Sequence, residues 1–310
     1  MNGIIPWAPG GGTDSNSRPL ALAAEKILGK SIVMTNKAGG AGVLGTKSVL
    51  DAPADGYTLL FNTEGGTTFQ VMGLADLNYV DYFDPIIVTA INKCAIIVDK
   101  ESKYQTFDEL MADIKANPGQ ITWGDCGSGS VADTAKGIIN KVEGFEVNTV
   151  IYAGDGPVIT AVIGGQLDCG GVALSVAVPY ILSGEIKCLG ILDKVAPDLL
   201  PNVPLLAERD DAYDTFVDAY GSWAAVFAKK GTDPAILEKL KEVFLQAYND
   251  PEYQKFLKDN GWTTLGLTGE EAEKFIRDKY EAMSWLLWVN GAAKESPEKY
   301  GIPKPANMDI

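Results

Sequence analysis

The chain contains no histidine and is poor in basic residues, with 26 Lys and Arg against 41 Asp and Glu. Histidine is the commonest general base, a common metal ligand and the usual partner of a nucleophilic Ser or Cys. The net charge of −15 disfavours nucleic acid and anionic lipid, and no basic cluster reverses it locally. We therefore expect no nucleic-acid partner, no metal and no cofactor. An anionic ligand must be held by local groups.

Cysteine pairs with metal-site spacing and long apolar runs are also missing. Cys94, Cys126, Cys169 and Cys188 lie in or beside apolar runs without C-x-x-C spacing, which predicts buried thiols and leaves any disulfide pairing open. No apolar run reaches eighteen residues, so no membrane span is expected. The first residues show no basic segment or cleavage site. An exported chain that had lost its signal and a cytoplasmic chain both fit this composition.

Short β-branched runs alternate with helical patterns, which is typical of mainly parallel sheets covered by helices. The expected strands are residues 3–7, 31–35 and 57–61, then 120–123, 147–152, 167–173 and 186–191. Thr106 and Glu109 predict a capping box before a helix that starts the second group. The end of the chain is helical, over 235–248, 251–260 and 269–289. We therefore expect an α/β protein with a discontinuous first lobe, 1–99 and 224–310, and an inserted second lobe, 100–223.

Three glycine-containing loops each leave a predicted strand and enter a predicted helix: Pro9–Asp14, Gly127–Ser130 and Ala153–Pro157. Such loops meet at the carboxyl edge of a parallel sheet, where ligands bind. Backbone N–H groups and the helix dipole hold a carboxylate or a phosphate there without Lys or Arg. The first loop lacks the Lys of a P-loop and the third Gly of a dinucleotide fingerprint. The alternative is a tight turn in which Thr13 or Asp14 caps the helix.

Two further kinds of side chain near these loops have alternative roles. Arg18 either reaches a ligand or pairs with Asp14 at i, i+4, and the pair is favoured. Trp7, Trp123 and Trp223 lie near strand ends and either stack on a ligand or pack in the core. Core packing is favoured for any single tryptophan.

Motifs along nearly the whole chain resemble one family. Residues 4–14 with Arg18, the glycine-rich segment 36–42 and the Asp-Gly-Tyr-Thr motif at 55–58 resemble the Bug family. Its members are the extracytoplasmic solute receptors of tripartite tricarboxylate transporters. The later matches follow in the family's order: Asn117–Gly119, Gly127–Ser130, Tyr152 with Gly154 and Pro157, Gly164–Asp168, Leu200–Pro204 and Ser222–Trp223.

The resemblance implies a type II periplasmic binding protein fold, whose two lobes close like a clamshell. It also implies a periplasmic receptor, not an enzyme, that captures a small carboxylate (a carboxylic acid or an amino acid) and delivers it to integral-membrane permease subunits. We expect the receptor to be a monomer. The export signal would have been removed. The ligand-binding positions expected are Trp7, Pro9, Gly10, Gly11, Gly12, Thr13, Asp14, Thr63, Glu64, Asp125, Gly127, Ser128, Gly129, Ser130, Tyr152, Gly154, Asp155, Val172 and Ala173.

Some positions depart from the family pattern. Asp125 and Asp155 stand where relatives usually carry Ser, and Val172 replaces a frequent Asp. If the two aspartates face the ligand, they disfavour a second carboxylate and favour an ammonium or hydroxyl group. The alternative is that they cap the next helices. The competing function is an enzyme on a similar two-lobed scaffold, for which only Cys126 offers a nucleophile.

Overall fold

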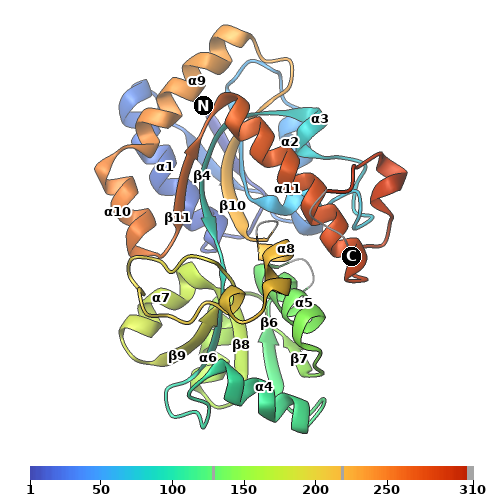
Figure 1. The fold of residues 1–310 in the computed structure, drawn as a ribbon. Helices are drawn as coiled ribbons and strands as arrows, with labels where there is room; N and C mark the ends of the chain where they lie inside the picture. Colours follow the sequence, from blue (N-terminus) through green and yellow to red (C-terminus); the bar gives the residue numbers. More distant parts are fainter. Residues whose placement is uncertain (128–129, 218–219, 306–310) are drawn as a thin grey trace. The chain divides into compact units, whose positions relative to one another are not determined.

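The computed structural model describes residues 1–127, 130–217 and 220–305 and separates into two compact units (Figure 1). Unit 1 comprises Met1–Ile91, Ser222–Asp259 and the chain from Thr263 onward, and unit 2 comprises Asn92–Gly221 with Asn260–Trp262. Each unit has its own sheet with helices packed against it. The predicted α/β fold with two sheets is therefore confirmed.

The sheet of unit 1 has six strands in the order β11-β4-β10-β3-β1-β2. β1 is parallel to β2 and β3, whereas β10 is antiparallel to β3 and β11 to β4. β1 ends one residue before Pro6, whose nitrogen has no hydrogen to donate, so it is shorter than predicted. The strands are β1 (Asn2–Ile5), β2 (Val33–Asn36), β3 (Thr58–Asn62), β4 (Phe83–Asn92), β10 (Ser222–Lys229) and β11 (Thr263–Leu267).

The helices of unit 1 include the predicted helical end of the chain. Gly29 adopts the left-handed conformation after α1, and its N–H bonds the carbonyl of Glu25, as the sequence predicts for a helix end. A core of buried residues, among them Tyr79, Trp223 and Phe227, packs between sheet and helices. The helices are α1 (Gly12–Leu28), η1 (Gly40–Gly42), α2 (Val43–Leu50), η2 (Glu64–Thr67), α3 (Tyr79–Tyr82), α9 (Pro234–Tyr248), α10 (Pro251–Asp259), α11 (Gly269–Val289) and η5 (Pro297–Tyr300).

The sheet of unit 2 has the order β7-β6-β8-β5-β9, in which β6 is parallel to β7 and β8. β5 is antiparallel to β8 and β9, so residues 94–99, which the sequence analysis placed in the first lobe, belong to the second sheet. The strands are β5 (Cys94–Asp99), β6 (Thr122–Asp125), β7 (Asn148–Ile151), β8 (Cys169–Ala173) and β9 (Ile186–Ile191).

The first helix of unit 2 begins where the sequence signal indicates, whereas α6 begins at Asp155, inside the predicted loop 153–157. The capping box is present, since Thr106 accepts from the N–H of Glu109 and Glu109 bonds back to Thr106. Within the described residues, no helix is long and apolar enough to cross a bilayer. The helices are α4 (Phe107–Ala116), α5 (Val131–Glu143), α6 (Asp155–Ile163), α7 (Leu174–Leu182), η3 (Leu206–Glu208), η4 (Asp211–Tyr213) and α8 (Asp214–Val217).

Candidate ligand-binding site

Each unit contains three adjacent parallel strands, and most of the predicted binding residues follow the ends of these strands. In unit 1 they lie after β1 and β3, and in unit 2 after β6, β7 and in β8. Half-site 1 is defined as Trp7, Pro9–Asp14, Asn36 and Asn62–Glu64. Half-site 2 is defined as Asp125–Gly127, Ser130, Tyr152, Gly154, Asp155, Val172 and Ala173. Ser128 and Gly129, also predicted, lie outside the described residues.

Asp14 organises the turn that precedes α1. Its carboxylate accepts from the Gly10 N–H at 3.0 Å, from Arg18 Nε at 2.9 Å and from Asn36 Nδ2 at 2.9 Å. Burial alone would raise the pKa of Asp14, but the hydrogen bond from Arg18, with those from Gly10 and Asn36, holds it below the ordinary value. The predicted Asp14–Arg18 pair is confirmed. Asp14 thus supports the turn.

The turn leaves the first N–H groups of α1 without a side-chain cap. The residue preceding the helix is Gly11, so the alternative in which Thr13 or Asp14 caps α1 is wrong. Gly10 has φ +81°, a conformation that glycine adopts without strain. Pro9, Gly10 and Gly11 are exposed. The first N–H groups of a helix have no intrahelical acceptor, so this turn offers donors and a partial positive charge to an anion.

Trp7 lies beside this turn and is half-buried. Its Nε1 donates to Asn62 Oδ1 at 2.7 Å, and its carbonyl accepts from Asn36 Nδ2 at 3.0 Å. A Cβ at Gly65 would lie 3.1 Å from the indole, so glycine lets η2 approach the ring. Trp123 and Trp223 are 0% and 1% exposed, which confirms that both pack in cores.

Glu64 and Thr63 follow β3. Thr63 is buried, whereas Glu64 is half-buried and accepts from Ser222 Oγ at 2.6 Å. Burial raises the pKa of Glu64 to about 7, despite the Ser222 hydrogen bond. Asn36, Asn62 and Ser222, which bond Asp14, Trp7 and Glu64, were not predicted as partners of site residues. Each is a polar residue at the end or the start of a strand, and this position could have indicated its role.

Asp125 in half-site 2 is fully buried and supports its own loop. Its Oδ2 pairs with Lys136 Nζ at 2.6 Å, and its Oδ1 accepts from the Gly127 N–H at 2.8 Å and from Ser130 Oγ at 3.4 Å. Ser130, not Asp125, caps α5 by accepting from the N–H of Asp133 at 3.1 Å. The prediction that Asp125 contacts a ligand therefore disagrees with its burial.

Asp155 is partly exposed at the start of α6. Its Oδ1 accepts from the Ala173 N–H at 2.9 Å and from Cys126 Sγ at 3.3 Å, and it makes no capping bond to its own helix. Burial, and then the Asp155 carboxylate, raise the pKa of the Cys126 thiol. Cys126 therefore remains a protonated hydrogen-bond donor at neutral pH.

The remaining predicted residues of half-site 2 differ in exposure. Val172 and Ala173 are buried, whereas Gly127, Ser130, Tyr152 and Gly154 are partly exposed. All four cysteines are free thiols. In the part of the chain that the structure describes, no three Cys, Asp or Glu side chains gather closely enough to hold a metal ion.

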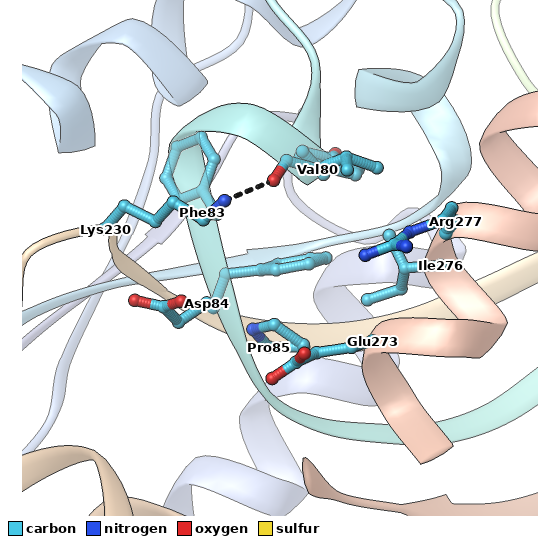
Figure 2. A pocket seen from close by; sticks show the side chains of 10 residues that line it. Val80, Phe83, Asp84, Pro85, Lys230, Glu273, Ile276 and Arg277 are labelled. Carbon is cyan, nitrogen blue, oxygen red and sulfur yellow. Dashed lines mark hydrogen bonds between the residues drawn. The ribbon is translucent and has the colours of Figure 1, made fainter. Parts of the chain in front are cut away.

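A small cavity of about 80 Å³ in unit 1 involves none of the predicted residues. Figure 2 shows Lys230 beside Asp84 and, from α11, Glu273, Ile276 and Arg277. Lys230 Nζ donates to the Val80 carbonyl at 2.6 Å. Carboxylates and basic groups are mixed in this lining, and α3, which begins at the lining residue Tyr79, is already capped by Asn78. The cavity therefore offers no defined anion site.

Comparisons with known proteins agree on one family. The sequence pattern described as tripartite tricarboxylate transporter family receptor matches residues 17–288. Protein BugT of Bordetella pertussis is 29% identical over 294 residues, which cover 93% of this chain and 88% of BugT. The structure of the periplasmic binding protein BugD has a TM-score of 0.83 at 25% identity and covers 95% of this chain and 98% of its own. A structure described as a periplasmic transporter has a TM-score of 0.82 at 26% identity, covering 97% of each chain.

Proposed function

Since the chain belongs to the receptor family of tripartite tricarboxylate transporters, we propose that it is a periplasmic receptor for a small carboxylate. In this proposal it delivers the solute to the integral-membrane permease subunits of its transporter and has no catalytic activity. Half-site 1 holds a carboxylate of the solute, and half-site 2 contacts another part of it. The Bug-family resemblance of the sequence is confirmed by the family match, and it supports this role.

The observation that carries the proposal is the uncapped start of α1. Gly11 provides no capping oxygen, and Asp14 is bound to Gly10, Arg18 and Asn36. The N–H groups of Gly12 and Thr13 therefore have no acceptor among the described residues, and both can donate hydrogen bonds to a ligand oxygen. A hydrogen bond to a charged group contributes about 1.5–3 kcal/mol, which is roughly a tenfold to hundredfold change in affinity. This suits a chain of net charge −15, because no basic side chain is needed.

Replacing Gly12 tests these N–H groups directly. Gly12→Pro removes one donor at the first helical position, where proline is tolerated, and Gly11 before it is extended, as a residue before proline requires. Gly12→Ala is the matched control, since a Cβ there meets nothing within 4 Å and the N–H remains. Calorimetric titration with the best carboxylate from a thermal-shift panel measures affinity.

We expect Gly12→Pro to weaken carboxylate binding at least tenfold while Gly12→Ala binds like the parent chain. Both variants should keep their free energy of unfolding. Equal affinity of the two variants would refute the role of the α1 turn. A panel in which no carboxylate binds, after unfolding and refolding to remove retained solute, would refute the proposed function itself.

The environment of Cys126 supports the receptor over the alternative of an enzyme that uses this thiol as its nucleophile. A nucleophilic cysteine must reach the thiolate form, which nearby cations favour. Cys126 instead donates to the Asp155 carboxylate at 3.3 Å, and burial together with that carboxylate raises its pKa. This environment supports a structural thiol.

A further inference from the structure

We propose that Asp155 determines the specificity of half-site 2, so that the solute carries one carboxylate and, away from it, an ammonium or hydroxyl group. This inference rests on the proposed function and narrows its substrate class. It assigns the selection to Asp155 alone, since Asp125 is buried and paired with Lys136.

Several hydrogen-bond donors that a second carboxylate could use in half-site 2 are already occupied. The Ala173 N–H is bound to Asp155, and the Gly127 N–H to Asp125. At the start of α7, the N–H of Leu174 bonds the Lys93 carbonyl at 2.8 Å, and that of Ser175 bonds Asn92 Oδ1 at 3.2 Å. Acceptors of the protein itself thus occupy these N–H groups, which are not available to a ligand carboxylate.

The start of α6 does not restore an anion site. Asp155 is its first residue, and its carboxylate offsets the partial positive charge of the helix N-terminus. The third residue of α6 is Pro157, which has no N–H. The nearby cation, Lys136, pairs with Asp125 at 2.6 Å and with Asp133 at 3.3 Å. A ligand carboxylate would meet a negative charge and few donors.

Asp155 does offer an acceptor to a donor group. Both of its bonds use Oδ1, and within the described residues Oδ2 accepts no hydrogen bond and Asp155 forms no ion pair. A carboxylate has about four acceptor positions, and the side chain is partly exposed. An ammonium gains both charge attraction and a hydrogen bond here, and a hydroxyl gains the hydrogen bond.

The test compares probes that differ only at the end remote from the carboxylate. At each chain length from three to six carbons, the linear monoacid, diacid, ω-hydroxy acid and ω-amino acid are titrated calorimetrically. The chain is first refolded to remove retained solute. The variants are Asp155→Asn, which keeps an acceptor for the Ala173 N–H without the charge, and Asp155→Ser, which also frees that N–H. Glu208→Gln removes an exposed charge in the same unit as a control.

We expect the parent chain to bind the hydroxy or amino acid at least tenfold more tightly than the diacid of equal length. Asp155→Asn and Asp155→Ser should each reduce this ratio about tenfold, whereas Glu208→Gln should preserve it. Tighter binding of the diacid by the parent chain, or a ratio unchanged in both variants, would overturn the inference and leave the carboxylate receptor intact. Binding of no acid of any class would overturn the receptor function and the inference together.

Discussion

The two half-sites occupy the same position in their sheets, at the ends of three parallel strands, but differ in what they offer a ligand. Half-site 1 presents the N-terminus of α1, which Gly11 leaves uncapped. In half-site 2, α5 is capped by Ser130, and α6 begins with Asp155. α6, like α1, has no side-chain cap, but its first residue is an aspartate that forms no ion pair among the described residues, whereas Asp14 of α1 is paired with Arg18. Half-site 2 therefore offers an unpaired carboxylate that half-site 1 does not offer at its helix start.

The ion pairs that hold the loops of the two half-sites also differ in burial. Asp14 pairs with Arg18, whose side chain is 46% exposed, whereas Asp125, with no exposure, pairs with Lys136, which is 17% exposed. Water weakens the first pair and screens the second much less. An aspartate thus holds a strand-to-helix loop in both half-sites, but the free-energy cost of removing the charged pair from water is much larger for Asp125 than for Asp14.

The largest effect is expected from Asp125→Ala. This change leaves the Lys136 ammonium without its buried partner and the Gly127 N–H without an acceptor, so we expect a loss of about 3–5 kcal/mol in the free energy of unfolding. Asp14→Ala, which breaks the more exposed pair, should cost about 1 kcal/mol. Urea denaturation of both variants measures the difference.

A double variant tests whether the loss in Asp125→Ala comes from the unpaired Lys136 charge or from lost packing. The double change Asp125→Ala with Lys136→Met should recover most of the lost stability, because no buried charge is left unpaired and Asp133, the other partner of Lys136, is 26% exposed. Equal losses in the two single aspartate variants would break the distinction between the half-sites.

An intermediate effect is expected from Glu64, the acid of half-site 1 whose pKa burial raises from 4.5 to about 7. Below pH 4.5 it is protonated in both the folded and the unfolded chain. Between pH 4.5 and 7 the unfolded chain loses this proton first, so stability falls as pH rises, by up to about 3 kcal/mol in total. Glu64→Gln should remove this contribution and be the more stable chain at pH 8.

Urea unfolding at pH 5 and pH 8 checks this sign. The advantage of Glu64→Gln should be small at pH 5 and large at pH 8, whereas Glu271→Gln, an exposed change on α11, should shift both values equally. A larger advantage at pH 5 would contradict the burial of the Glu64 carboxyl.

Local signals predicted much of the fold because they depend on neighbouring residues. Thr106 and Glu109 are three residues apart, so the start of α4 was predicted from sequence. Gly29 directly follows a helical pattern, so the end of α1 was predicted as well. β11 was missed, since its residues are partly exposed, Gly266 interrupts its pattern, and only pairing with β4 makes it a strand. Strand partners are long-range information that a local pattern lacks.

The same limit applies to the candidate site. The glycine-rich turn at 9–14 and the loop after β6 were visible as sequences, as was the Asp14–Arg18 spacing. The sequence did not reveal that Asp125 points inward to Lys136, eleven positions away. Its side-chain direction depends on how α5 packs. Position in a loop predicted proximity to the site but not which atoms face outward.

The smallest effect on stability, and the sharpest test of capped against uncapped helices, is expected from Gly11→Ser. Gly11 has φ −76° and ψ 171°, which serine adopts readily, and a Cβ there meets only the Ala8 carbonyl at 3.7 Å. The new hydroxyl should cap α1 as Ser130 caps α5, raising the free energy of unfolding by a few tenths of a kcal/mol. It then competes with the ligand for the same N–H groups, so carboxylate affinity should fall several-fold, by about 1 kcal/mol. Gly11→Ala adds the same Cβ without the oxygen and should leave affinity unchanged in calorimetric titration. If Ser and Ala weaken binding alike, the hydroxyl is not the competitor, and the uncapped N-terminus of α1 is not where half-site 1 holds the carboxylate.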